Sequence, residues 1–172
     1  MTNNKENTNL KIKKKESIKS ITICLFIILI TFFCDRVTKN IIINDQSEYN
    51  KIFINDYINF DLIWNTGIGF GLLSLEASIF YHLISTVIVL IVFLIIYLII
   101  NSNNFDRYIY STLLGGAAGN LYDRLIYFAV PDFIDLHINN FHWFTFNVAD
   151  IFISFSIMLL LINEILIKKK NV

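Results

Sequence analysis

The stretch VPDFIDLHINNFHWFTFNVAD (residues 130–150) separates two long apolar runs and carries an acidic side chain near each of its ends. Asp132 lies near the first end and Asp150 at the second, each close to an expected membrane boundary. An ionisable carboxylate beside hydrocarbon costs free energy, so such a residue usually has a functional role. Two of them in this arrangement favour acid/base chemistry in which the pair shares one proton.

The composition places the chain in a lipid bilayer. Its 172 residues are 55% hydrophobic and 15% aromatic, and the mean hydropathy is +0.59, which excludes an ordinary soluble domain. Hydrocarbon about 30 Å thick requires roughly 20 helical residues for each crossing. Four segments have this length, at about 19–40, 77–100, 107–128 and 147–167. We therefore expect an all-α polytopic membrane protein with four transmembrane helices.

The charges predict the orientation of these helices. Lysines precede the first expected span and follow the last, and Arg107 follows the short connection 101–106. The other two connections, about 41–76 and 129–146, hold seven acidic residues and a single lysine, Lys51. Because basic connections tend to stay in the cytoplasm, we expect both termini there and the two acidic connections outside. The balanced net charge excludes a general attraction to nucleic acid.

The regions outside the spans are expected to be simple. Residues 1–18 are polar and without periodicity, which predicts a disordered cytoplasmic tail, and 168–172 form a basic cytoplasmic tail. Residues 19–167 then form a single four-helix domain. The segment INFDLIWN (58–65) alternates larger apolar with mostly polar residues, and a period of two is typical of a strand. A small extracytoplasmic β element is expected within about 45–76.

Two of the spans carry patterns that predict contacts between helices. Gly115, Ala118 and Gly119 form a small-residue face in the third span, which favours close packing at the centre of a bundle. Asp35 and Lys39 lie four residues apart near the outer end of the first span. Because that spacing puts them on one face of a helix, we expect an intramembrane ion pair.

Further polar residues lie at the outer ends of the third and fourth spans. Asn120 is three and four residues from Asp123 and Arg124, so it can share a face with either. We interpret Asp123 and Arg124 as an ion pair that holds the helix end in place. Asn147 and Asp150 are three apart at the start of the fourth span and project to one side of it.

Three alternatives to a catalytic aspartate pair stay open from the residues alone. Asp150 can be a carboxylate that stabilises a helix N-terminus, with Asp132 an ordinary loop residue. A transporter or proton-coupled channel subunit would use Asp35, Asp123 and Asp150 to mark an ion path, although broken helices are not evident at the midplane.

The third alternative is a metal-dependent lipid-modifying enzyme. Its ligands have the right chemistry, but their spacing matches no established pattern. The residues of this candidate metal site are Asp132, Asp135, His137 and His142.

Five motifs together resemble one family. DRVTK (35–39), NTGIGF (65–70), GGAAGNLYDR (115–124), VPDFID (130–135) and FNVAD (146–150) occur in the order typical of the bacterial lipoprotein signal peptidases, the type II signal peptidases. The resemblance covers nearly the whole chain after residue 19. It implies an intramembrane aspartyl endopeptidase of the bacterial inner membrane. Such an enzyme removes the signal peptide from diacylglyceryl-modified prolipoproteins at the outer face, during lipoprotein maturation.

The resemblance also assigns roles to residues. It makes Asp132 and Asp150 the catalytic pair. Substrate-binding or supporting roles fall to Asp35, Lys39, Asn65, Gly67, Asn120, Asp123, Arg124 and Asn147. It implies no cofactor and no metal. The expected partners are membrane lipids and lipid-modified prolipoproteins, and the expected state is a monomer.

Two positions depart from the family pattern. Pro131 precedes Asp132 where a branched aliphatic residue is usual, and Gly69 stands where Ala or Ser is usual. Pro131 fixes its own φ and biases Val130 toward extended backbone, so the approach of Asp132 can differ slightly. Neither change removes a reacting group, and we expect an effect on rate rather than on the reaction.

Overall fold

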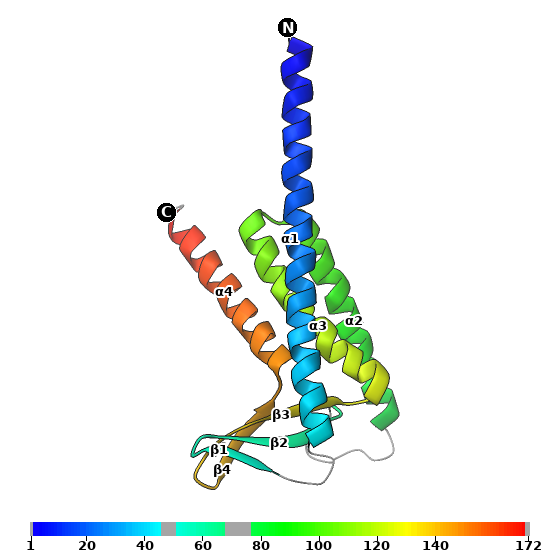
Figure 1. Cartoon of the computed structure of the whole chain (residues 1–172), viewed down its shortest axis with the longest axis vertical. Helices are drawn as coiled ribbons and strands as arrows, with labels where there is room; N and C mark the ends of the chain where they lie inside the picture. Colours follow the sequence, from blue (N-terminus) through cyan, green and yellow to red (C-terminus); the bar gives the residue numbers. More distant parts are fainter. Residues whose placement is uncertain (1, 46–50, 68–76, 171–172) are drawn as a thin grey trace.

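Helices and a small sheet divide the molecule into two parts (Figure 1). The computed structural model describes residues 2–45, 51–67 and 77–170. The helices are α1 (Thr2–Asp45), α2 (Ala77–Asn101), α3 (Asn104–Tyr127) and α4 (Val148–Lys170). The strands are β1 (Ile52–Asn55), β2 (Ile58–Asn65), β3 (Val130–Ile138) and β4 (Phe141–Phe146). They form an antiparallel sheet in the order β1-β2-β3-β4, at the end of the helices opposite the start of α1 and the end of α4.

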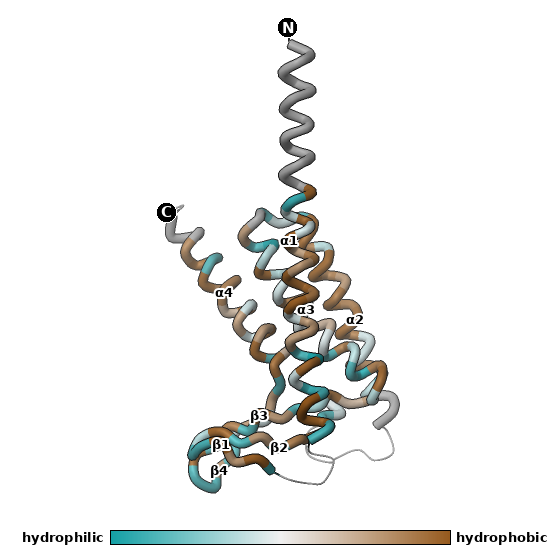
Figure 2. Tube along the Cα trace, in the orientation of Figure 1, coloured by the Kyte–Doolittle hydropathy of each residue, from teal (hydrophilic) through white to brown (hydrophobic). Residues whose placement is uncertain are grey.

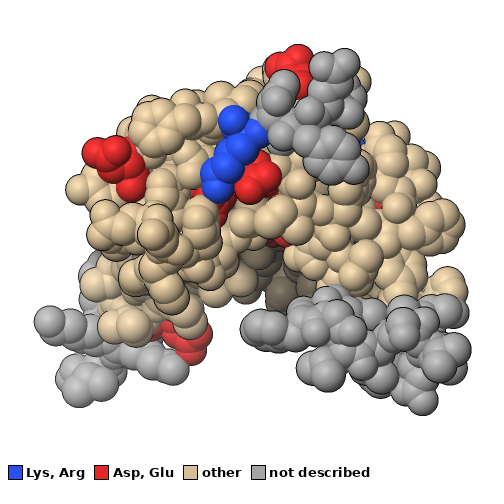
Figure 3. All heavy atoms as spheres, turned by 90° about the horizontal axis from the view of Figure 1, so that it is seen from below, with Lys and Arg blue, Asp and Glu red and all other residues tan. Residues whose placement is uncertain are grey.

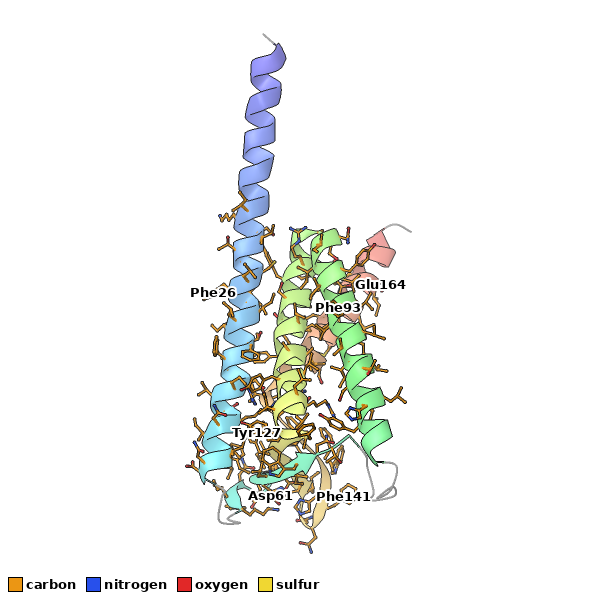
Figure 4. All side chains as sticks on the ribbon, turned by 90° about the vertical axis from the view of Figure 1, so that its right-hand side faces the viewer. Phe26, Asp61, Phe93, Tyr127, Phe141 and Glu164 are labelled. Carbon is orange, nitrogen blue, oxygen red and sulfur yellow. The ribbon has the colours of Figure 1, made fainter. Side chains whose placement is uncertain are left out.

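Three of the described helices are long and apolar enough to cross a membrane: Ile18–Asp45, Tyr81–Asn101 and Val148–Leu166. Figure 2 shows that hydrophobic residues make up most of these three spans. Many of their apolar side chains are exposed, as are Phe26 and Phe93 (labelled in Figure 4), with 65% and 64% of their surface accessible. The fourth expected span, α3, is not among the three. It carries two acidic and two basic residues and contacts all three other helices.

The predicted small-residue face is confirmed where α3 meets α1. A Cβ on Gly115 would overlap Thr31 Oγ1 and lie 2.8 Å from the carbonyl oxygen of Ile28. A Cβ on Gly119 would lie 2.5 Å from Asp35 Oδ2. These glycines let the two backbones approach closely enough for polar side chains to meet between them.

The β element is larger than expected. Strand β2 has the predicted bounds, but β3 and β4 come from 130–146, which was expected only as an outward connection. The two-residue turn between them, Asn139 and Asn140, is a hairpin signal, and Asn139 has the positive φ of 52° that such turns require. Pro131 lies within β3 opposite Trp64 of β2, so the sheet accommodates it.

The expected disordered tail at 1–18 differs from the structure, in which α1 begins at Thr2. Lysine and glutamate are good helix formers, and a helix already formed by the apolar span extends at little cost. Lys168 to Lys170 are the last turn of α4 rather than a separate tail. Gly69 lies outside the described residues.

Gly115→Ala tests the close approach of α1 and α3. We expect the free energy of unfolding to fall by about 1–3 kcal/mol, because overpacking outweighs the gain in helix propensity. Denaturation in mixed detergent micelles measures this. Leu125→Ala, at a side chain that is 62% exposed, is the control and should change stability less. Removing the Thr31 hydroxyl in a Thr31→Ala/Gly115→Ala protein should recover part of the loss. A Gly115→Ala protein as stable as the wild type would contradict this packing.

Candidate functional site

A buried cluster of four charges joins α1 to α3 near the sheet. Lys39 is fully buried and donates hydrogen bonds to Asp35 Oδ2 at 2.8 Å and Asp123 Oδ2 at 2.7 Å. Its third hydrogen bond goes to Asn120 Oδ1 at 2.8 Å, and Arg36 Nη1 lies 2.6 Å from Asp123 Oδ1. The predicted pair of Asp35 and Lys39 is confirmed. Each buried charge has an opposite charge beside it, which burial requires.

The predicted ion pair between Asp123 and Arg124 is wrong. Consecutive side chains on a helix point in different directions, so Asp123 turns to α1 while Arg124 lies against Gly67. A Cβ on Gly67 would be 3.1 Å from Arg124 Nη1, and its φ of +81° suits glycine. The hydroxyl of Tyr81 donates to the Arg124 carbonyl oxygen. Among the described residues, Arg124 Nε and Nη1 are buried without a hydrogen-bond partner.

The start of α4 is held by reciprocal hydrogen bonds. Asn147 Oδ1 accepts from the Asp150 backbone N–H, and Asp150 Oδ2 accepts from the Asn147 backbone N–H, each at 3.1 Å. This is a capping box, so Asp150 does stabilise a helix N-terminus. Asp35 Oδ1 accepts from the Ala149 N–H at 3.0 Å, and Asn120 Nδ2 donates to Asp150 Oδ1 at 2.8 Å. Residues from α1 and α3 therefore fix where α4 begins.

Asp132 approaches the same place from the sheet. Its Oδ2 accepts from Asn65 Nδ2 at 2.9 Å and its Oδ1 from Asn147 Nδ2 at 2.6 Å. Asn147 thus contacts both Asp132 and Asp150. Burial raises the pKa of Asp132, the two asparagine hydrogen bonds lower it, and the negative charge of Asp150 raises it again. The net result is a pKa above the ordinary value for an aspartate.

The three asparagines can present only their N–H groups to the aspartates. Each amide oxygen already accepts from a group that can only donate. These pairs are Asn65 with Gly67 N at 2.7 Å, Asn147 with Asp150 N at 3.1 Å, and Asn120 with Lys39 Nζ at 2.8 Å. The amide nitrogens must therefore face the carboxylates.

The candidate metal site forms only in part. Asp135, His137 and His142 have ligand atoms within 4.8 Å of one another, but Asp132 is not in this group. Side chains alternate along a strand, so Asp132 points to the opposite face of β3 from Asp135. Burial by itself would raise the pKa of Asp135, but hydrogen bonds and positive charge from His142 and Lys51 outweigh it and hold the pKa below the ordinary value.

The sequence of this chain matches one family along most of its length. A sequence model of the family described as Signal peptidase (SPase) II matches residues 27–166. A lipoprotein signal peptidase of Pelagibacter ubique (strain HTCC1062) is 44% identical over 159 residues, which are 91% of this chain and 96% of the relative. One of Thermodesulfovibrio yellowstonii is 38% identical over 138 residues, 80% and 89% of the two chains.

Solved structures share the fold. Two bacterial membrane enzymes, whose structures were obtained by the in meso method at 2.3 and 1.9 Å resolution, are 28% and 29% identical to this chain. Their TM-scores are 0.65 and 0.66. The first similarity covers 86% of this chain and 87% of the other, and the second covers 84% and 91%.

Lys39→Met tests whether the cluster of charges supports the fold. It removes the cation that is hydrogen bonded to both Asp35 and Asp123 and leaves Arg36 beside them, and we expect a loss of about 3–5 kcal/mol in the free energy of unfolding. Lys51→Met is the matched control. Lys51 is 41% exposed and pairs with Asp61 and Asp135, so its loss should cost below about 1 kcal/mol. Equal effects of the two substitutions would contradict the role given to Lys39.

Proposed function

The chain belongs to the signal peptidase II family, and from this premise we propose that it is an intramembrane aspartyl endopeptidase. It cleaves the signal peptide from diacylglyceryl-modified prolipoproteins in lipoprotein maturation. The observation that carries the proposal is that Asp132 and Asp150, from a strand and a helix far apart in sequence, are both hydrogen bonded to Asn147. Such a pair can activate water without a cofactor.

The hydrogen bonds support different roles for the two acids. The N–H groups of Asn120 and Asn147 and the N-terminus of α4 stabilise a negative charge on Asp150. Asp132 is 4% exposed, and its raised pKa favours the protonated form. Asp150 then takes a proton from water as the water oxygen attacks the scissile carbonyl, while Asp132 donates its proton to the developing oxyanion. As the intermediate collapses, Asp150 gives the proton it took from water to the leaving amine, and the Asp132 carboxylate takes back a proton from the hydroxyl that becomes the new carbonyl.

The position of the pair between helices and sheet favours cleavage at the outer membrane face. We place α3 across the bilayer as a fourth span, because it lies among three helices that can cross it. The lysine-rich ends of α1 and α4 then lie in the cytoplasm and the sheet outside the inner membrane. A lipid anchor on the substrate would hold the scissile bond at a fixed depth, which supplies orientation.

A cavity beside the pair can take an apolar part of the substrate. It has a volume of about 380 Å³ and is lined by Asp150 and by side chains of β4 and α4 such as Phe146 and Met158. On the face seen from the sheet end, basic atoms lie beside acidic ones and the surface is hollowed near its middle (Figure 3). We expect the enzyme to act as a monomer on substrates that reach it through the lipid.

Removing either carboxylate tests the mechanism. Asp132→Asn and Asp150→Asn should each lower the cleavage rate of a diacylglyceryl-modified precursor by at least about 100-fold. Product formation on gels measures it, with a strong chelator present. Asp61→Asn is the matched control, because Asp61 is 43% exposed on β2 and should leave the rate unchanged. The proposal would be contradicted if a folded Asp132→Asn or Asp150→Asn protein cleaved the precursor at the wild-type rate. It would also be contradicted if the chelator abolished cleavage by the wild-type protein.

Asn65→Ala tests the ionisation of Asp132. The Asn65 hydrogen bond lowers the pKa of Asp132, so its removal must raise that pKa. The limb of the pH–rate profile that Asp132 governs should move to higher pH, whether Asp132 acts as acid or as base. Asn101→Ala, at an exposed asparagine near the other end of the helices, should leave the profile in place. An unmoved profile in the Asn65→Ala protein would contradict the assignment.

A further inference from the structure

Two histidines and an aspartate gather on the sheet, apart from the aspartate pair. Asp135 and His137 are two residues apart on β3 and therefore share a face of the sheet. His142 on β4 lies directly across from His137. Imidazole and carboxylate are the ligands that Zn²⁺ takes together with thiolate. One face of the β3–β4 hairpin thus presents a ligand set suited to a first-row transition metal.

The three side chains are already close enough to converge on one ion. His142 Nδ1 lies 2.9 Å from Asp135 Oδ1 and 2.8 Å from Oδ2, and His137 Nδ1 lies 3.9 Å from Oδ2. The two rings are stacked with centroids 5.3 Å apart. Asp135 and His137 are buried, whereas the His142 side chain is 48% exposed. Two ligands are therefore buried in the sheet, and the third is accessible from solvent.

The ammonium group of Lys51 already pairs with the Asp135 carboxylate. Lys51 Nζ lies 3.2 Å from Asp135 Oδ2 and 3.5 Å from Asp61 Oδ2. Because the Lys51 side chain is 41% exposed, it can turn toward Asp61 and leave Asp135 free. The lysine then competes with an ion for Asp135 rather than blocking it.

A buried amide next to His137 supplies a second observation. Asn59 is 6% exposed, its Nδ2 lies 3.3 Å from His137 Nδ1 and 3.4 Å from Nε2, and its Oδ1 is without a hydrogen-bond partner among the described residues. A histidine bound to metal through one ring nitrogen keeps an N–H on the other, which needs an acceptor. With its amide turned over, Asn59 Oδ1 is that acceptor.

We propose that Asp135, His137 and His142 bind one divalent ion of the Zn²⁺ class at the outer sheet, separately from the aspartate pair. Three protein ligands leave room for water at the remaining coordination position. The ion ties β3 to β4 near their turn. Because β3 also carries Asp132, the ion stabilises the strand that delivers this acid but takes no part in the reaction.

Metal titration of the purified full-length chain, carrying no histidine tag, tests the site. Calorimetry with Zn²⁺ should show one ion per chain, and Co²⁺ should give the visible absorption of a site with nitrogen ligands. His137→Ala and His142→Ala should each weaken binding by about tenfold or more. Lys51→Ala should tighten it. His82→Ala is the matched control, because His82 is the one histidine of the sequence outside the proposed site and lies on α2.

Several outcomes would overturn the site. They are a wild-type chain that binds no Zn²⁺, a His137→Ala/His142→Ala protein that binds as the wild type does, and equal weakening by His82→Ala. Zn²⁺ should also raise the Tm of the wild type but not of the double variant, whose fold circular dichroism verifies. Cleavage of a precursor is followed in parallel without metal, so failure of the metal site and failure of the aspartyl mechanism are told apart.

Discussion

The buried ammonium of Lys39 is the interaction on which the rest of the site depends. An isolated charge in the interior would cost several kcal/mol, and Lys39 avoids this by directing its three hydrogen bonds to Asp35, Asp123 and Asn120. Through Asn120 it reaches Asp150 at the start of α4. Asp35 caps the same helix end. One cation thereby sets the relative positions of α1, α3 and α4.

The helices expose large apolar side chains and bury several charged and polar ones, which suits a bilayer. Its fully buried side chains include Lys39, Asn147, Asp35 and Asp123, while phenylalanines and leucines cover the outer faces of the helices. In lipid, polar groups are stable only when they find partners within the protein. Charged and amide side chains of α1, α3, β3 and α4 therefore hydrogen bond to one another near the start of α4. The same need for partners that stabilises the bundle orients the two aspartates.

The spacing of residues within one segment predicted the features that lie within a single helix or strand. The period of two in 58–65 predicted β2, and the spacing of Asp35 and Lys39 predicted their contact. Contacts between segments that are far apart in the sequence were harder to predict. Strand β3 pairs with β2, far away in sequence, and its acidic residues made it look like a loop. The predicted ion-pair partner of Asp123 was its sequence neighbour Arg124, because nothing in the local sequence indicates that the partners of Asp123 lie on α1.

In the proposed mechanism, Asp132 and Asp150 act together on one water molecule. A structure of the protein with a lipid-modified peptide whose scissile amide is replaced by hydroxyethylene tests it most directly, because that hydroxyl imitates the attacking oxygen. We expect the hydroxyl to lie within hydrogen-bond distance of both carboxylates, with Asn147 still joining them. A bound analogue whose hydroxyl meets only one aspartate, or neither, would contradict it.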